Sequence, residues 1–392
     1  SLIMVLRIAL RTISLFIDSL HDIPMKQLFL LLASLMLIHS AFAETIPATD
    51  SRITFVGRAV VEDGSLRFDW PSTYFRIAFT GKKLSMRLSD TQCNFYAVWV
   101  DCPSSADPTR IVETRGNDTI VELVLPTDLK HSKIKEHQVI LQKRTEATCG
   151  TTTIYSFTTD GCFLQAEQFK SRQIEFIGDS YTCGYGVDAA SRMDRFSPNT
   201  ENASRTYASI VARYFDADYV TIAHSGRGIC RNAESSYPWE LMSDLYQYTI
   251  DRDSTINWSI SQSDFRPDIT IIYLGANDFS GWIIPNYNEF RKGYIRLLEA
   301  VKSNYGNDHP ILCMTPGPYE CLLTYVREVV NNCGMDNVYF LGLCPAIHDN
   351  ATDQDLGAGW HPNYNGQLKI AYSAIPYIAT ITGWGLQDNP VK

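Results

Sequence analysis

The sequence predicts a β-sandwich of jelly-roll type followed by an α/β domain built on a doubly wound parallel sheet. The chain has 392 residues, and single hydrophobic cores stop growing near about 250 residues, so two domains are expected. About eight strand-like segments precede any convincing helix, whereas strands and amphipathic helices alternate beyond Phe169. Such alternation is typical of a parallel sheet with helices on both faces.

The first 43 residues are expected to lie outside both domains. Residues 25–43 combine a short positive start, an apolar centre and an A-x-A sequence, which is the pattern of a secretory signal peptide. The alternative, a membrane span, needs roughly 20 apolar residues, more than this segment offers. Residues 1–24 begin with Ser and carry acidic side chains, so they resemble sequence translated upstream of a start at Met25. We therefore expect a secreted or periplasmic protein without a stable membrane anchor.

The β-sandwich is predicted to span residues 44–168. Segments such as 65–70 and 84–88 alternate apolar and polar residues, and turn residues such as Asp63-Gly64 separate them. This period-two pattern predicts half-buried strands. Their short, regular spacing favours a jelly roll over other β folds.

The α/β domain is predicted to span residues 169–392. Residues 173–177 and 219–223 are expected strands, and the nearly continuous apolar run at 268–274 fits a parallel strand that is buried on both faces. An amphipathic helix is expected at 290–301. Further strands are expected at 310–313 and 338–341, and a closing helix at 367–378. Ligands of such sheets bind beyond the carboxyl ends of the strands.

Composition excludes some classes of partner and cofactor. The net charge is -9 with no basic block, so no nucleic-acid partner is expected. No C-x-x-C pair or histidine-rich cluster has metal-ligand spacing, so we predict neither a metal nor another cofactor. Export would permit disulfides among the ten cysteines. Cys183 and Cys230 are one candidate bridge, and two buried free thiols are the alternative.

Two motifs at strand ends offer a nucleophile and one oxyanion donor. Ser180 lies in the Gly-rich sequence GDSYTCGYG directly after a strand, where a sharp turn would expose its hydroxyl and direct its own N–H at an oxyanion. Gly226 lies in the sequence HSGRG after the next strand, and a small residue there permits close approach of a backbone N–H. Taken alone, either loop is equally compatible with a passive turn.

Two further motifs offer a second donor and a base. Asn277 follows a buried strand in the sequence GAND, and its side-chain amide can donate to an oxyanion, although such a residue also stabilises turns. His361 lies in the Gly-rich sequence GAGWHPN after the last strands, well placed to face Ser180. His224 is the main competitor as base. Trp360, Asp278 and Tyr185 lie within these motifs and are candidates for contact with substrate.

The order Ser180, Gly226, Asn277, His361 resembles the signature of SGNH (GDSL-type) hydrolases. The likeness is closer to carbohydrate esterase family 2, whose members place a jelly-roll domain before a flavodoxin-like SGNH domain. The sequences VGR at 56–58, FDWP at 68–71, GDSYTCGYG and GWHPN carry this likeness.

The resemblance implies a metal-independent serine esterase, acting as a monomer, that removes O-acetyl groups from plant-type polysaccharides such as xylan or glucomannan through an acetyl-enzyme. The alternatives are an SGNH lipase or arylesterase acting on other small esters, and a non-catalytic carbohydrate-binding protein. Hydrolysis of a chromogenic acetate separates the last of these from an enzyme.

One departure from the family pattern concerns the third member of a catalytic triad. These enzymes carry Asp two or three residues before the histidine, where this chain has Gly359 and Ala358. Asp355 and Asp353 lie nearby at other spacings. We therefore predict a Ser–His dyad in which a backbone carbonyl orients His361, whose pKa would be about 6.5 if unperturbed.

Overall fold

The computed structural model describes residues 43–392 except 131, 133, 234–239, 318 and 387–392. Residues 1–42, which include all but the last residue of the expected signal peptide, lie outside the described residues. Among the helices that are described, none combines the length and the apolar character needed to cross a membrane.

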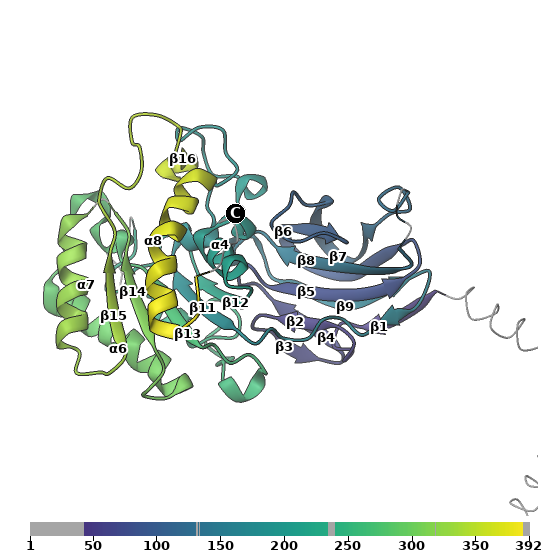
Figure 1. Cartoon of the computed structure of the whole chain (residues 1–392), viewed down its shortest axis with the longest axis horizontal. Coiled ribbons are helices and arrows are strands. Elements are labelled where there is room, and N and C mark those ends of the chain that lie inside the picture. Colours follow the sequence, from purple (N-terminus) through teal and green to yellow (C-terminus); the bar gives the residue numbers. More distant parts are fainter. Residues whose placement is uncertain (1–42, 131, 133, 234–239, 318, 387–392) are drawn as a thin grey trace, which may run out of the picture.

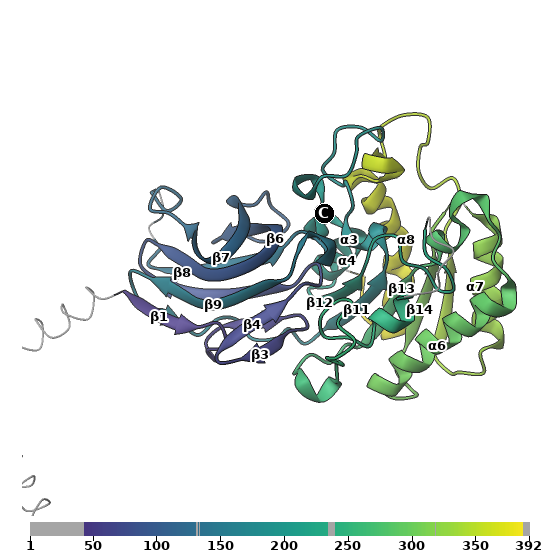
Figure 2. The same cartoon turned by 180° about the vertical axis from the view of Figure 1, so that it is seen from behind.

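The N-terminal domain is one ten-stranded antiparallel sheet that curls around its own core (Figures 1 and 2). One edge of the longest strand, β6, pairs with β7, while its other edge pairs first with β9 and then with β8. Alternate residues of these strands are buried, as the period-two pattern predicts. The strands are β1 (Glu44–Pro47), β2 (Thr54–Val56), β3 (Val60–Glu62), β4 (Ser65–Phe68), β5 (Tyr74–Thr80), β6 (Leu84–Val100), β7 (Arg110–Val124), β8 (Glu136–Lys143), β9 (Thr152–Thr159) and β10 (Phe163–Leu164).

The C-terminal domain has a parallel sheet of five strands in the order β12-β11-β13-β14-β15. These are β11 (Gln173–Gly178), β12 (Asp218–Ala223), β13 (Ile269–Tyr273), β14 (Ile311–Thr315) and β15 (Val338–Gly342). The helices are α3 (Ser180–Cys183), α4 (Tyr207–Tyr214), α5 (Met242–Leu245), α6 (Tyr287–Tyr305), α7 (Glu320–Asn332) and α8 (Tyr364–Thr382). A short hairpin of β16 (Leu356–Gly357) and β17 (His361–Pro362) precedes α8.

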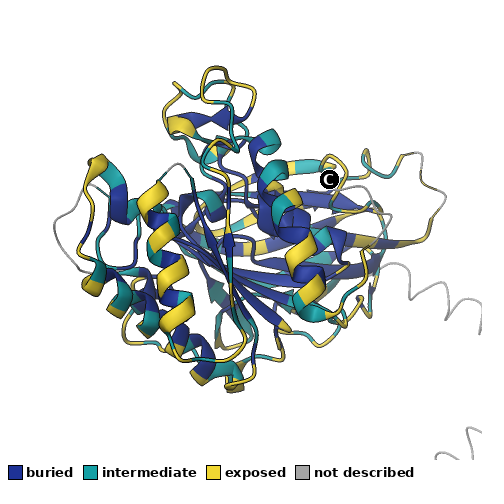
Figure 3. Cartoon of the chain, turned by 60° about the vertical axis from the view of Figure 1, so that its left-hand side comes forward, coloured by how far each residue is buried: buried dark blue, intermediate teal, exposed yellow. Residues whose placement is uncertain are grey.

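Both faces of the parallel sheet are buried, which explains why its strands are apolar throughout. In β13, Ile271 joins the core formed with α4 and α8, whereas Ile272 joins the core formed with α6 and α7. Figure 3 shows the strands as buried and the outward sides of the flanking helices as exposed. The doubly wound α/β fold expected from the sequence is thereby confirmed.

Buried polar contacts join the two domains. Arg76 of β5 binds Asp218 of β12 through two hydrogen bonds of 2.8 and 2.7 Å. Arg58, in the sequence VGR at 56–58, forms an ion pair with Glu175 of β11 at 3.2 Å. The indole of Trp70 donates to the carbonyl of Thr249. Buried charges are costly unless they are paired, so these contacts favour one fixed arrangement of the domains.

Candidate active site

Three neighbouring strands bring the first three motifs to one edge of the sheet. In the register of the sheet, Gly178 at the end of β11 pairs with Ala223 of β12 and with Tyr273 of β13. The loops that contain Ser180, Gly226 and Asn277 therefore leave the sheet side by side. Glycine is required at 178, because a Cβ atom there would lie 2.0 Å from the hydroxyl of Thr182.

Ser180 and His361 form a hydrogen bond although they are far apart in the sequence. The distance from Ser180 Oγ to His361 Nε2 is 2.8 Å. Ser180 is the first residue of α3, and the Asp179 carboxylate caps this short helix by accepting from the N–H of Tyr181 at 3.1 Å. The hydroxyl is thus held at a fixed point against the imidazole.

Backbone carbonyls contact the other nitrogen of the imidazole. His361 Nδ1 lies 3.0 Å from the carbonyl oxygen of Gly359 and 3.2 Å from that of Ala358. The chain can turn back in this way because Gly359 adopts a φ of 60°. With a proton on Nδ1, the ring donates to these carbonyls and leaves Nε2 free to accept the proton of Ser180.

The two nearby aspartates bind other groups. The carboxylate of Asp355 is fully buried, pairs with Lys369 and accepts from the N–H of Asp349. Asp353 accepts from the backbone and the side chain of Arg192. In the part of the chain that the structure describes, neither aspartate forms a hydrogen bond with His361.

The surroundings of His361 favour its neutral form. Burial of the imidazole lowers its pKa to about 4, and the carbonyls of Gly359 and Ala358 and the charge of Glu146 only partly oppose this effect. This differs from the value of about 6.5 that the sequence alone suggests. Because a general base must be neutral to accept a proton, the lower pKa would let His361 act as a base in more acidic solution.

We therefore expect kcat/KM to stay high as pH falls through 6 and to decline only as pH approaches the His361 pKa of about 4. Acetate release from a small acetyl ester, followed between pH 3 and pH 8, measures this profile. Circular dichroism at each pH separates loss of the base from acid unfolding. A half-maximal rate near pH 6.5 would contradict the expected effect of burial.

The geometry also places Asn277 between the first two motifs. Its Nδ2 donates to the carboxylate of Asp179 at 3.1 Å and to the carbonyl oxygen of Arg227 at 2.8 Å. Burial raises the pKa of Asp179 to about 7, so this carboxyl group is a weakened acceptor near neutral pH. Because both amide hydrogens are engaged, contact with an oxyanion requires Asn277 to exchange one of these two acceptors. Gly226, at a φ of 79°, lies in the same loop as Arg227.

Replacing Asn277 with alanine is expected to lower kcat by roughly 10² to 10³ with little change in KM, as is typical for a donor that acts in the transition state. Steady-state kinetics on a soluble acetyl ester measure both constants. Asn277→Asp, which has a similar shape but cannot donate, is the matched variant and should be at least as inactive. A change confined to KM would assign Asn277 to substrate binding.

Two polar residues of the motifs, His224 and Asp278, form hydrogen bonds within the protein and do not face the Ser180–His361 pair. His224 is buried, and its Nδ1 lies 3.0 Å from both carboxylate oxygens of Asp251, so it does not face Ser180 as a competing base would. Asp278 is fully buried and accepts from the backbone N–H groups of residues 229–231. These contacts do not support the substrate contact predicted for Asp278 and make it an anchor of the neighbouring loop.

A cleft of about 370 Å³ opens over the Ser180–His361 pair. Asn277, Trp360 and Tyr319 line it together with that pair. Trp360 is 49% exposed and adopts a φ of 64°, an unusual conformation for a large side chain. The indole is thus held at the surface beside the base, as a substrate contact requires.

The predicted substrate residue Tyr185 packs behind the base. Its ring lies 4.3 Å from that of His361 and 4.5 Å from that of Phe196, between ring centroids. Phe196 belongs to the loop after the nucleophile motif, and Arg192 of the same loop lies 4.8 Å from the Trp360 ring. This loop therefore borders the His361 side of the cleft.

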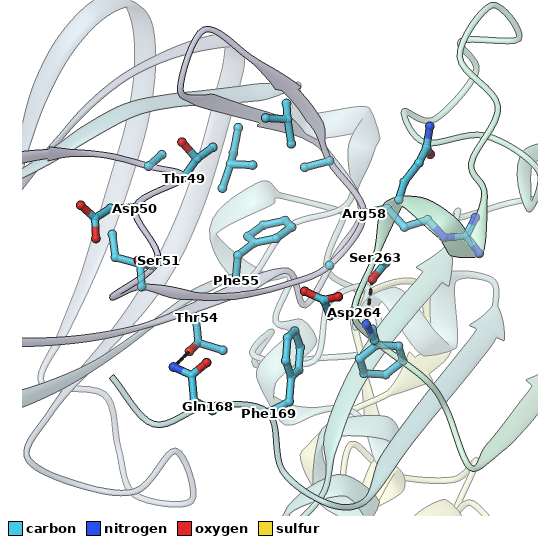
Figure 4. Close-up of a pocket in the computed structure, with 18 of the residues that line it drawn as sticks. Thr49, Asp50, Ser51, Thr54, Phe55, Arg58, Gln168, Phe169, Ser263 and Asp264 are labelled. Atoms are coloured by element: carbon cyan, nitrogen blue, oxygen red, sulfur yellow. Dashed lines mark hydrogen bonds between the residues drawn. The ribbon is translucent and has the colours of Figure 1, made fainter. Parts of the chain in front are cut away.

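A second cavity, of about 440 Å³, is lined by residues of both domains (Figure 4). Phe55, Phe169 and Trp258 contribute to its lining. Gln168 bonds to Thr54 within the cavity wall. None of the residues of the four motifs lines this cavity.

All ten cysteines carry free thiols, so the candidate bridge between Cys183 and Cys230 is not formed. Of the two free thiols, Cys183 is buried as the alternative predicted, whereas Cys230 is half-buried. Among the described residues, one group has the spacing of metal ligands: Glu146, Cys183 and Glu201 place ligand atoms within 4.8 Å of one another, and all three are buried. Neither Glu146 nor Glu201 stands in a recognisable motif, so neither could be predicted as a ligand from the sequence.

Comparison with known proteins supports this picture. A family model described as "Carbohydrate esterase 2 N-terminal" matches residues 55–166, and one described as "GDSL-like Lipase/Acylhydrolase family" matches residues 176–369. An acetylxylan esterase/glucomannan deacetylase of Cellvibrio japonicus is 28% identical over 82% of this chain and 89% of its own length. The cellulase/esterase CelE of Acetivibrio thermocellus is 31% identical over 80% of this chain, which spans only 38% of that larger protein.

Solved structures agree in fold and order of domains. A family two carbohydrate esterase from Clostridium thermocellum, in complex with cellohexaose, has a TM-score of 0.76 and 30% identity and is matched over 100% of its length and 85% of this chain. A family two esterase from Cellvibrio japonicus has a TM-score of 0.76 at 23% identity, a likeness in fold. With both family models matched in succession and a solved member matched along its whole length, this chain belongs to carbohydrate esterase family 2 and is a carboxylic ester hydrolase.

Proposed function

We propose that the protein is a secreted esterase that removes O-acetyl groups from plant-type polysaccharides such as xylan or glucomannan, through a Ser180–His361 dyad. The observation that carries the proposal is the hydrogen bond of 2.8 Å between Ser180 Oγ and His361 Nε2, within a cleft that Asn277 also lines. This is the contact between nucleophile and base that acyl transfer requires.

In the proposed reaction, neutral His361 accepts the proton of Ser180 as the serine oxygen attacks the acetyl carbonyl. The N–H groups of Ser180 and Gly226 and the amide of Asn277 stabilise the oxyanion. Protonated His361 then donates its proton to the departing sugar oxygen, which leaves an acetyl group on Ser180. Water, activated by His361 in the same way, releases acetate and restores the free serine.

The carbonyls of Gly359 and Ala358 would take over the orienting role of the usual aspartate. Their oxygens accept from Nδ1 and so favour the ring orientation in which Nε2 faces Ser180. A carbonyl carries only a partial charge and stabilises the imidazolium less than a carboxylate does. The dyad would therefore depend more strongly on other nearby negative charge.

Support for a carbohydrate substrate comes from the relatives and from the cleft. Two relatives of Cellvibrio japonicus are acetylxylan esterase/glucomannan deacetylases, and the Clostridium thermocellum structure holds cellohexaose. Trp360 offers an exposed indole beside the base, and Trp282, 85% exposed, contacts the cleft residue Tyr319. Exposed aromatic faces of this kind suit stacking against sugar rings.

An NMR time course on acetylated xylan and acetylated glucomannan tests the proposal. We expect the acetyl signals of at least one polymer to convert to free acetate, and the order in which ring-position signals disappear to identify the hydroxyl. Long-chain fatty acyl esters serve as the competing substrates. Cleavage of those esters with both polymers left intact would favour the alternative of a lipase-like enzyme.

A further inference from the structure

A buried carboxylate of the N-terminal domain reaches the loops of the esterase site. Glu146 follows β8 in the antiparallel sheet and is 1% exposed. It lies at the contact between the two domains, and its side chain enters the C-terminal domain. A buried carboxylate is unfavourable unless its oxygens have donors, so the groups that it contacts indicate its role.

One oxygen of Glu146 contacts both α3, the helix that begins at Ser180, and the loop that contains Gly226. Oε2 accepts from the backbone N–H of Ser225 at 2.8 Å and lies 3.7 Å from the thiol of Cys183. Ser225 directly precedes Gly226, whose N–H is a proposed oxyanion donor. Cys183 is the last residue of α3, the helix that begins at Ser180. The carboxylate therefore contacts both α3 and the loop of Gly226. In the proposed reaction, the distance between Ser180 and the N–H of Gly226 must stay fixed.

Glu146 is itself fixed by its neighbours. Its backbone N–H donates to Glu201 Oε2 at 2.9 Å, and its carbonyl oxygen accepts from the ammonium group of Lys143 at 3.2 Å. Burial and the nearby Glu146 raise the pKa of Glu201 well above its usual range. The Cys149 thiol completes the group by facing Glu201 Oε2 at 3.7 Å.

We propose that Glu146 is a positioning residue of the esterase site: its carboxylate holds the N–H of Ser225 and the end of α3, and so sets the oxyanion donor of Gly226 relative to Ser180. This inference rests on the proposed roles of Ser180 and Gly226. It gives the N-terminal domain a part in the chemistry of the C-terminal one, because the acceptor that orders the oxyanion loop comes from the other sheet.

The charge of Glu146 has a second effect. It favours the protonated form of His361, which arises when the base has taken the serine proton. The other groups against the imidazole are the Ser180 hydroxyl, the carbonyls of residues 358 and 359, and the rings of Tyr181 and Tyr185. Among the described residues, no aspartate contacts His361. Glu146 is thus a carboxylate whose negative charge acts on His361 without a direct contact.

The test compares Glu146→Ala with Glu146→Gln on 4-nitrophenyl acetate, an ester that does not depend on glycan recognition. Alanine removes the acceptor and leaves the half-buried Ser225 N–H without its partner, so kcat should fall by about 10- to 100-fold at nearly constant KM, less than for loss of an oxyanion donor itself. Glutamine keeps an acceptor oxygen and should restore kcat to within a few-fold. Its lost charge should move the acid limb of the pH profile to lower pH.

Asp218→Asn is the matched control, because Asp218 is another buried carboxylate at the domain contact and binds Arg76 instead of a catalytic loop. It should lower the unfolding temperature without lowering kcat. Wild-type kcat in Glu146→Ala would overturn the proposal, as would an equal loss of kcat in Asp218→Asn.

Two outcomes cover the remaining cases. If Glu146→Ala does not fold, an unmoved acid limb together with a large loss of kcat in Glu146→Gln overturns the proposal. Inactivation of the wild type by EDTA with recovery on added Zn²⁺ also overturns it, because Glu146, Cys183 and Glu201 would then be metal ligands. Hydrolysis of the small ester without deacetylation of polysaccharide would refute only the proposed substrate.

Discussion

Ser180→Ala is expected to lower kcat by around 10⁶-fold, the loss typical of a nucleophile in a serine hydrolase. The substitution removes one oxygen atom, whose described hydrogen-bond partner is His361. The cap of α3 is formed by Asp179 and does not involve the Ser180 hydroxyl. The variant should therefore keep the wild-type circular dichroism spectrum and unfolding temperature.

The measurement is initial-rate hydrolysis of a chromogenic acetate with enough enzyme to detect a residual 10⁻⁶ of the activity. Ser261→Ala, at an exposed serine of the same domain, is the matched control and should retain full activity. Retention of a tenth of the wild-type rate in Ser180→Ala would remove the nucleophile assignment. Hydrolysis of the same chromogenic acetate by the wild-type protein would exclude the non-catalytic alternative.

The three motifs that follow β11, β12 and β13 could be located from the sequence because the ends of neighbouring parallel strands share one edge. Gly178, Ala223 and Leu274 each mark the end of an apolar run, so the loops after them had to meet. His361 was predictable from its Gly-rich loop, although its contact with Ser180 depends on the hairpin that β16 and β17 form.

The sequence does not reveal where a buried carboxylate finds its hydrogen-bond donors. Asp278 stands in a motif at the cleft, yet its carboxylate turns inward to three backbone N–H groups of another loop. Glu146 stands in no motif at all, and its contact with Ser225 exists only because the two domains pack together. The lowered pKa of His361 likewise follows from burial, which spacing does not give.

The sequence predicted that the N-terminal domain consists of strands, but it did not predict their number correctly. About eight strands were expected, and the sheet has ten. Short strands such as β1 and β10 offer too few residues for a period-two pattern. The long strand β6 also changes partner along its length, from β9 to β8. That change depends on the curl of the sheet and has no local sequence signal.

His361→Ala is expected to be nearly as damaging as Ser180→Ala, because without a base the serine hydroxyl remains protonated. Asp355→Ala and Asp353→Ala should change kcat by no more than a few-fold. Loss of a third triad member typically lowers kcat by about 10⁴-fold. A dyad and a triad therefore predict clearly different rates for the aspartate variants. The expectation follows from the contacts of His361 Nδ1, which are to the carbonyls of Gly359 and Ala358.

The two aspartate variants should differ in stability. Asp355 is fully buried and pairs with Lys369, so its removal leaves the N–H of Asp349 without its acceptor and should lower the unfolding temperature. Asp353 has a side chain that is 45% exposed, and its loss should cost little. Rates are therefore compared at a temperature at which circular dichroism shows each variant folded. A collapse of kcat in folded Asp355→Ala would replace the dyad with a triad in which the acid acts on His361 from an unusual spacing.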